Sequence, residues 1–222
     1  MLTLVLTRHG ATDRSDPEQY LGQHIEAHLT EDGKAAARAL GERLAPVTFE
    51  RVMTSPLERA METARLIRPT DPVEPDDRLA EADYGLWEGR TVAEIEASWP
   101  AEREAYENDP ALNAAVGGES GGEVARRVGS LLKELVQWAG SGGSSGGPEE
   151  DQRVLLVGHS TLNRVLLAAA LGVPLPDYRR RFRQDWANLT VLRFGRRFGG
   201  GWQLLVCNDM AHLRGTSGAT WD

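Results

Sequence analysis

Val154-Leu155-Leu156-Val157, followed by Gly158-His159-Ser160, is the stretch of sequence that best defines the fold. The continuous apolar run is typical of a strand that is buried on both faces of a parallel sheet. An apolar helix is predicted directly after it, over residues 161–171, because Gly172 and Pro174 then end the pattern. A buried strand that leads into a helix is characteristic of α/β folds.

The same alternation of short apolar runs and helical patterns continues along the rest of the chain. The predicted strands are Leu2–Thr7, Arg51–Thr54, Val154–Val157, Leu189–Phe194 and Trp202–Val206. The predicted helices cover residues 30–44, 55–66, a segment that opens at 91, 123–138 and 161–171. We therefore predict a single-domain, three-layer α/β/α sandwich with a mainly parallel sheet.

Local signals set several of the predicted boundaries. Thr30 is a plausible N-cap, and both Ser55-Pro56-Leu57-Glu58 and Thr91-Val92-Ala93-Glu94 have the sequence of a capping box. Pro100 is expected to interrupt or restart the helix that opens at Thr91. We predict a small helical cap at about residues 86–116 and a flexible Gly/Ser-rich surface loop at residues 139–151.

Composition restricts the partners and the kinds of site. The net charge of -8 disfavours a nucleic-acid partner, and no run approaches the length of a membrane span, so neither partner is expected. The start of the chain lacks the features of a signal peptide, and a single cysteine fits a reducing compartment, so we expect a cytoplasmic protein. Cys207 lies in an apolar run and is expected to be a buried structural thiol. All 25 basic residues except Lys34 and Lys133 are arginines, which we interpret first as a compositional bias.

Polar residues that could bind an anion follow the predicted strands. Arg8-His9-Gly10 follows the first strand, Arg59 lies just after the second, and His159 follows the strand at 154–157. Ligands of open α/β sheets bind at the carboxyl ends of the strands, so these residues could meet at one edge. Arginine offers planar donors to phosphate oxygens, and neutral histidine is a competent nucleophile toward phosphorus. Taken singly, each of these residues is more often structural or on the surface.

Taken together, they are similar to the motifs of a known family. Leu6-Thr7-Arg8-His9-Gly10-Ala11-Thr12 resembles the Arg-His-Gly signature of the histidine phosphatase superfamily, which includes cofactor-dependent phosphoglycerate mutases. Further blocks resemble those of the family in the same order, and together they span about residues 3–213. These blocks are Thr54–Ala64, Leu79–Gly89, Gly117–Ser120, Val157–Ser160 with Asn163-Arg164, and Asn208-Asp209 with His212-Leu213.

The resemblance implies a phosphoglycerate mutase-like fold and a role for each matching residue. His9 would be the nucleophile that becomes phosphorylated, and Glu81 the general acid and base. Three residues, Arg8, Arg59 and His159, would hold the phosphoryl oxygens. Phosphate or substrate contacts are also expected from Thr12, Ser15 and Ser160. The implied substrate is a small phosphorylated metabolite, with no cofactor and no metal, and a homodimer is compatible with the sequence.

Three positions depart from the usual family pattern. Ala11 stands where an acid or amide is frequent, Ser15 where asparagine is usual, and Ser160 where glycine is usual. The first two could change contacts to the phosphate or to the residues around it, and Ser160 adds a hydroxyl that could change substrate choice. None of them removes a core catalytic group.

Other motifs have the wrong spacing. Gly158–Leu162 lacks the second glycine of a serine-hydrolase elbow, and His24–His28 has its glutamate in the wrong place for a zinc protease helix, so we expect a loop there. The Gly-rich stretch at 140–147 lacks the lysine of a P-loop. Tyr178–Arg183 is basic; we expect a solvated helix face first and a substrate contact second.

Two alternatives to a phosphomonoester hydrolase remain open from the sequence. One is a cofactor-dependent phosphoglycerate mutase. The other is a catalytically weak phosphate-binding or scaffold protein that uses the same fold, against which the intact set of His9, Arg8, Arg59, Glu81 and His159 argues.

Overall fold

One mixed, mostly parallel sheet forms the centre of the computed structural model, which describes residues 1–143, 151–195 and 198–213. The strand order is β3-β2-β4-β1-β5-β6. The four strands from β3 to β1 are mutually parallel, and β5 and β6 run antiparallel to their neighbours. The strands are β1 (Leu2–Arg8), β2 (Arg51–Thr54), β3 (Val73–Pro75), β4 (Gln152–Gly158), β5 (Leu189–Gly195) and β6 (Gly201–Asp209).

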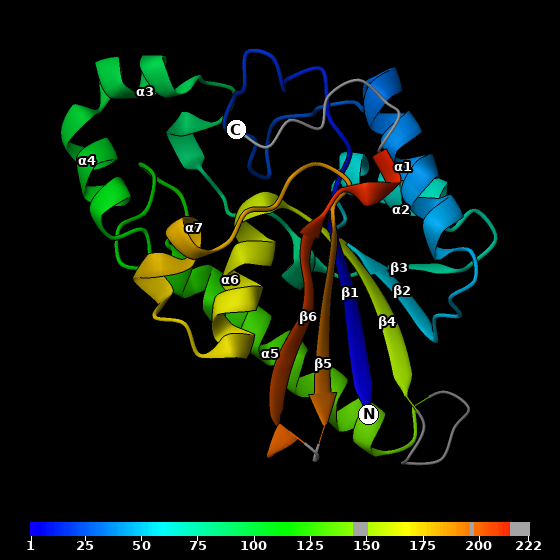
Figure 1. Ribbon diagram of the computed structural model, residues 1–222. Helices are drawn as coiled ribbons and strands as arrows, with labels where there is room; N and C mark the ends of the chain where they lie inside the picture. Colours follow the sequence, from blue (N-terminus) through cyan, green and yellow to red (C-terminus); the bar gives the residue numbers. More distant parts are fainter. Residues whose placement is uncertain (144–150, 196–197, 214–222) are drawn as a thin grey trace.

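Helices cover both faces of this sheet, which confirms the predicted α/β class (Figure 1). Figure 1 shows α1 and α2 on one side and α5 and α6 on the other, with α3 and α4 beyond the carboxyl end of β1. The helices are α1 (Glu31–Leu44), α2 (Glu58–Ile67), α3 (Val92–Ser98), α4 (Pro100–Asn108), α5 (Gly121–Gly140), α6 (Ser160–Leu171) and α7 (Tyr178–Arg181).

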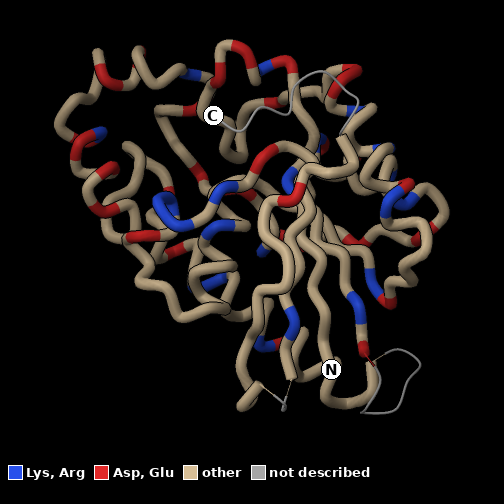
Figure 2. The backbone as a smooth tube through the Cα atoms, viewed as in Figure 1, with Lys and Arg blue, Asp and Glu red and all other residues tan. Residues whose placement is uncertain are grey.

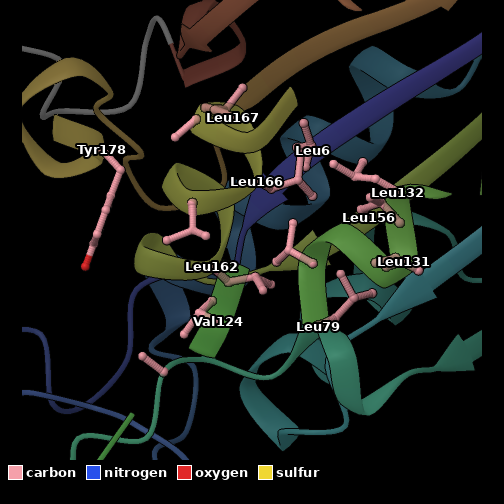
Figure 3. Packing of buried hydrophobic residues seen from close by; sticks show 14 of the residues in the cluster. Leu6, Leu79, Val124, Leu131, Leu132, Leu156, Leu162, Leu166, Leu167 and Tyr178 are labelled. Carbon is pink, nitrogen blue, oxygen red and sulfur yellow. The ribbon is translucent and has the colours of Figure 1, made fainter. Parts of the chain in front are cut away.

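The apolar run of β4 is continuous because each face of the strand contacts a separate hydrophobic cluster. Val154 and Leu156 pack with residues of α5 and α6, whereas Leu155 and Val157 pack with residues of α1 and α2. Figure 3 shows Leu156 close to the leucines of α5. Successive side chains of a strand point to opposite faces, so both faces must be apolar when both are covered.

Several predicted helix boundaries are confirmed. The side chain of Thr30 caps α1, and Thr91 and Glu94 form a capping box at the start of α3. Pro100 is at the first turn of α4, and Gly172 ends α6 in the left-handed conformation at φ 67°. Local sequence was sufficient here because each cap bonds only to its own first turn.

Two predictions from the sequence are wrong. Ser55 does not open a capping box: its N–H donates to Val157 O at the end of β4, its Oγ accepts from Leu57 N, and α2 begins only at Glu58. Cys207 is exposed rather than buried, because β6 is the edge strand of the sheet and Cys207 lies on its open face. A contact to the neighbouring strand and a position at the sheet edge are both properties of the whole fold.

The predicted Gly/Ser loop and the predicted helical cap can be compared with the structure only in part. Residues 144–150 of the predicted Gly/Ser loop lie outside the described residues, and residues 139 and 140 belong to α5. The interval 86–116 contains α3 and α4, and its role as a cap stays a prediction. Within the described parts of the chain, none of the helices combines the length and hydropathy needed to cross a membrane.

Candidate active site

His9 and His159 lie next to each other because they follow two neighbouring parallel strands. β1 and β4 are in register up to the pair Arg8 and Gly158, and the N–H of His9 donates to Gly158 O over 3.0 Å. The two rings are 5.1 Å apart between centroids and tilted by 60°. His9 is 4% exposed and His159 is fully buried.

One ring nitrogen of His9 is held by its own backbone. Nδ1 lies 2.8 Å from the carbonyl oxygen of Gly10, and a carbonyl oxygen only accepts, so this hydrogen bond places the proton on Nδ1. Nε2 then keeps its lone pair. The geometry therefore presents Nε2 as the nucleophilic nitrogen.

The turn after His9 is packed closely against α1 and α2. A Cβ on Gly10 would come within 2.5 Å of Gly33 O in the first turn of α1, so only glycine fits without a shift. The N–H of Gly10 donates to Thr63 Oγ1, which in turn donates to Arg59 O. These contacts fix the position of His9 relative to α2.

Burial keeps both histidines neutral. Desolvation, followed by the positive charges of Arg59 and Arg8, lowers the pKa of His9 well below its ordinary value of 6.5. Desolvation and then Arg59 likewise lower the pKa of His159 well below 6.5. Neither ring nitrogen of His159 has a hydrogen-bond partner among the described residues. The site therefore holds one neutral imidazole as a nucleophile and a second with free polar atoms.

These lowered pKa values predict the pH dependence of the free enzyme. A histidine with a lowered pKa stays deprotonated to lower pH, so the acid limb of kcat/KM should lie below pH 6.5. The measurement is kcat/KM for an aryl phosphate between about pH 4 and 8, corrected for ionisation of the substrate phosphate. An acid limb centred at or above 6.5 would contradict a neutral, buried nucleophile.

Arg8 and Arg59 are held mainly by backbone carbonyls. Arg59, 3% exposed, donates through Nη2 to Gly22 O over 2.7 Å. Arg8 donates to Gln184 O over 3.2 Å and lies over the ring of Trp186 at 4.9 Å. Arg8 also has a carboxylate partner, because Glu18 Oε1 lies 3.5 Å from its Nη2. The printed partners of Arg59 are neutral carbonyls, which orient its guanidinium group without cancelling its charge, so Arg59 remains able to bind an anion.

The carboxylate of Glu81 lies at the N-terminus of α6. It is 4% exposed and accepts hydrogen bonds from three backbone N–H groups, those of Ala82, Thr161 and Leu162, over 2.9 to 3.1 Å. A helix N-terminus favours a negative group. The backbone thus fixes the orientation of a carboxylate that lines the same cavity as His9.

Three side chains to which the sequence analysis assigned no role fix the backbone around Glu81. Arg127 of α5 and Gln23 both donate to Glu81 O, over 3.0 and 2.8 Å. Glu119 accepts from both of them, over 3.1 and 3.2 Å. Arg127 lies within the helix predicted at residues 123–138, and no local spacing could have linked it to Glu81.

Glu88 performs a similar role for Arg59. Its two oxygens accept hydrogen bonds from the backbone N–H groups of Gln23, His24, Ile25 and Tyr84. These bonds hold the segment that follows Gly22, whose carbonyl oxygen binds Arg59. A Cβ on Gly22 would collide with Glu88 Oε1. His24, Asp83 and Glu88 are close enough to resemble a metal cluster, but the oxygens of Glu88 are already occupied by these four donors.

A cavity of about 610 Å³ opens over the site, within the size range of small-molecule pockets. Of the predicted site residues it brings together Arg8, His9, Ser15, Glu81 and Ser160. The other three, Thr12, Arg59 and His159, do not line it. Each of them is at most 3% exposed, and the oxygen of Thr12 contacts Ser15 Oγ at 3.3 Å.

Arginines that were not expected at the site also line the cavity. The cavity lining contains six arginines and three acidic residues, although the chain as a whole has a negative net charge. Tyr178–Arg183 supplies two of them, Arg179 and Arg183. Arg180, Arg181 and Arg183 are exposed, as expected for a solvated face, and a substrate contact of this segment stays a prediction. The six are Arg8, Arg14, Arg103, Arg164, Arg179 and Arg183; the acids are Glu18, Glu81 and Asp185.

This arrangement suits transfer of a phosphoryl group. A neutral imidazole with a free Nε2, two cations that keep their charge, and a fixed carboxylate share one site. The nucleophile can attack phosphorus, the guanidinium groups can stabilise the charge on the equatorial oxygens, and the carboxylate can transfer a proton.

Comparisons of this chain with known proteins agree on one protein family. The model of the histidine phosphatase superfamily (branch 1) matches residues 4–210. Among curated proteins, a glucosyl-3-phosphoglycerate phosphatase of Mycolicibacterium vanbaalenii is 37% identical over 177 residues, or 79% of this chain and 76% of the relative. Phosphoserine phosphatase 1 of Hydrogenobacter thermophilus is 29% identical over 217 residues, or 96% and 95% of the two chains.

Solved structures agree with the sequence matches. A mycobacterial glucosyl-3-phosphoglycerate phosphatase in complex with inorganic phosphate superposes with a TM-score of 0.80 at 36% identity. The match covers 95% of this chain and 98% of the other. The likeness therefore extends over nearly the full length of both chains.

Proposed function

This chain belongs to the histidine phosphatase superfamily and is a phosphomonoester hydrolase, and we propose that it acts through a phosphohistidine formed on His9. The observation that carries the proposal is the state of His9. Its Nδ1 proton is committed to Gly10 O, its pKa is lowered by burial, and Nε2 is left as the nucleophile. A histidine that served only to pack the core would not need arginines and a carboxylate beside it.

The proposed reaction has two steps. In the first, Nε2 of His9 attacks phosphorus, the ester P–O bond breaks, and Glu81, which starts this step in its protonated form, gives its proton to the departing oxygen and becomes a carboxylate. In the second, water attacks phosphorus, Glu81 takes a proton from it, and the N–P bond breaks to release inorganic phosphate and restore neutral His9. Glu81 thus acts first as acid and then as base.

The other predicted residues have binding roles in this proposal. Arg8 and Arg59 stabilise the charge on the phosphoryl oxygens, and His159 donates the single N–H of its neutral ring, neither nitrogen of which has a partner among the described residues, to the same oxygens. Ser160 lines the cavity at the N-terminus of α6 and offers a hydroxyl to the substrate. Thr12 acts through its contact with Ser15, which does line the cavity.

Turnover of a generic aryl phosphate tests the activity itself. The proposal requires release of phosphate with saturation kinetics, and a scaffold protein would bind the compound without turnover. A panel of small phosphorylated metabolites ranked by kcat/KM would then define the substrate, since the relatives have more than one. Location in the cytoplasm, assembly as a homodimer and the cap at residues 86–116 remain predictions.

Hydrolysis is expected to dominate over mutase activity. A mutase must hold its phosphorylated intermediate away from water, which requires a well-closed pocket. The segment between Gly89 and Glu119, which contains α3 and α4, has only about thirty residues with which to close the site. Incubation with phosphoglycerates should therefore release inorganic phosphate faster than it isomerises them. Efficient isomerisation that depends on a bisphosphoglycerate, with little free phosphate, would instead identify a mutase.

A further inference from the structure

The last of the matching sequence blocks lies at the end of β6 and just after it, and it has no part in the proposed reaction. It contributes two polar side chains, Asn208 and His212, and neither of them lines the cavity that contains the nucleophile. We propose that both are positioning residues for Arg8. They act through residues 184–188, which we call the support segment.

The support segment follows the basic helix α7, whose arginines are blue in Figure 2, and leads into β5. It contacts Arg8 in three places. Gln184 O accepts a hydrogen bond from Nη1 of Arg8 over 3.2 Å, and the guanidinium group lies over the ring of Trp186 at 4.9 Å. The N–H of Ala187 donates to Arg8 O over 2.9 Å. The support segment therefore fixes both the backbone and the charged group of Arg8.

His212 holds Ala187 in an unfavourable backbone conformation. The φ of Ala187 is 54°, in the left-handed region that a residue with a Cβ rarely adopts. Such a conformation persists only where the surroundings fix it from several sides. The N–H of Ala187 is bonded to Arg8 O, and its carbonyl oxygen accepts from Nε2 of His212 over 2.9 Å. Loss of the bond to His212 would therefore allow Ala187 to relax away from Arg8.

Asn208 holds the other end of the support segment. Its Oδ1 accepts from Asp185 N over 2.7 Å, and its Nδ2 donates to Asp185 Oδ2 over 2.8 Å. The φ of Asn208 is 50°, a left-handed value that asparagine tolerates better than most residues do. Asp185 directly follows Gln184, whose carbonyl oxygen binds Arg8. His212 and Asn208 thus hold the support segment on both sides of Trp186.

The block itself is anchored to parts of the fold that do not line the cavity. Asp209 pairs with Arg43 of α1, and the N–H of Asn208 donates to Thr190 Oγ1 of β5 over 3.0 Å. A rigid support keeps a catalytic side chain within the narrow range of positions in which it can bind the reacting group. We therefore expect phosphate binding by Arg8 to depend on residues that the substrate does not touch. This inference rests on the proposed role of Arg8 in holding the phosphoryl oxygens.

The test measures Ki, the competitive inhibition constant of inorganic phosphate, against an aryl phosphate as substrate. Ki does not depend on the amount of folded enzyme, so a merely structural loss would lower the rate without changing Ki. His212→Phe keeps an aromatic ring but has no donor for Ala187 O, and Ki should rise about tenfold, as expected when a charged hydrogen bond is weakened. His212→Gln should keep Ki within about twofold of the wild type, because its amide N–H can replace the imidazole donor.

Asn208→Gly provides a second, independent variant. Glycine adopts a φ of 50° without strain, so the variant loses only the two side-chain bonds to Asp185. Ki should again rise, by about threefold to tenfold. His28→Phe is the matched control, because His28 is exposed and does not line the cavity, and Ki should stay within about twofold of the wild type.

Combination with Arg8→Gln tests whether the block acts through Arg8. Arg8→Gln alone should raise Ki about tenfold or more, because a charged donor to phosphate is lost. Adding His212→Phe to this variant should change Ki by no more than about twofold, since the effects of two substitutions that weaken one interaction are not additive.

Three results would contradict the inference, and they differ in what else they refute. A rise in Ki on adding His212→Phe to Arg8→Gln, as large as in the wild type, would show that His212 does not act through Arg8. An unchanged Ki in both His212→Phe and Asn208→Gly, together with a raised Ki in Arg8→Gln, would show that the block is only structural. An unchanged Ki in Arg8→Gln would refute the proposed role of Arg8 and, with it, this inference.

Discussion

His9→Ala is expected to lower kcat for every phosphomonoester by about 10⁴-fold or more. The reason is that no other side chain of the site can take over covalent attack on phosphorus. Among the described residues, the ring of His159 lies next to that of His9, at 5.1 Å between centroids, and the proposal assigns this ring to holding the phosphoryl oxygens. The measurement is kcat for an aryl phosphate and for the best metabolite of the panel.

His28→Ala is the matched control for this variant. His28 is an exposed histidine in a neighbouring loop, and its substitution should leave kcat within about twofold of the wild type, as is usual for surface positions. Circular dichroism and the melting temperature should show that His9→Ala is folded. Near-normal activity of folded His9→Ala would show that another group is the nucleophile.

Glu81→Gln should lower kcat by about 10²–10⁴-fold for substrates with poor leaving groups. Glutamine preserves the shape of the side chain but cannot transfer a proton to the leaving oxygen. An activated aryl phosphate needs little protonation, so it should still phosphorylate His9 in this variant. The measurement is the dependence of kcat/KM, which reports the steps up to release of the alcohol, on leaving-group pKa, compared between wild type and variant.

The structure adds a second consequence for the same variant. Both carboxylate oxygens of Glu81 accept backbone N–H groups, Oε1 from Ala82 and Leu162 and Oε2 from Thr161. Glutamine has only one oxygen, so one of these donors would lose its acceptor at a cost of about 1–3 kcal/mol. We therefore expect a lower melting temperature as well. Equal losses of kcat/KM, which reports the steps up to release of the alcohol, for activated and poor leaving groups would indicate this structural damage rather than protonation of the leaving group.

The sequence predicted those features of the fold that depend on local chemistry. Thr91 and Glu94 form their capping box, and Arg51–Thr54 is a strand with the predicted bounds, because the relevant contacts are close in sequence or periodic. Ser55 shows the limit of such reasoning. Its N–H pairs with β4, about a hundred residues away, and this tertiary contact displaces the start of α2 to Glu58.

The sequence predicted those site residues that directly follow a strand. It did not predict the side chains that bind backbone groups far away along the chain. Arg8, His9 and His159 could be placed together because parallel strands end at one edge of a sheet. Arg127, Gln23 and Glu88 support the site only through bonds to carbonyl and N–H groups far along the chain. The abundance of arginine, interpreted as a bias of composition, in fact supplies six residues of the cavity lining.

Trapping of the covalent intermediate tests the central claim most directly. Rapid quenching of Glu81→Gln with a ³²P-labelled activated aryl phosphate should capture the enzyme before water removes the phosphoryl group, since that step needs the base. The label should be acid-labile and comparatively stable to base, as expected for a nitrogen–phosphorus bond, and peptide mapping should place it on His9 alone. A label on the peptide that contains His159, or none in a variant that still releases the aryl alcohol in a burst, would contradict the account.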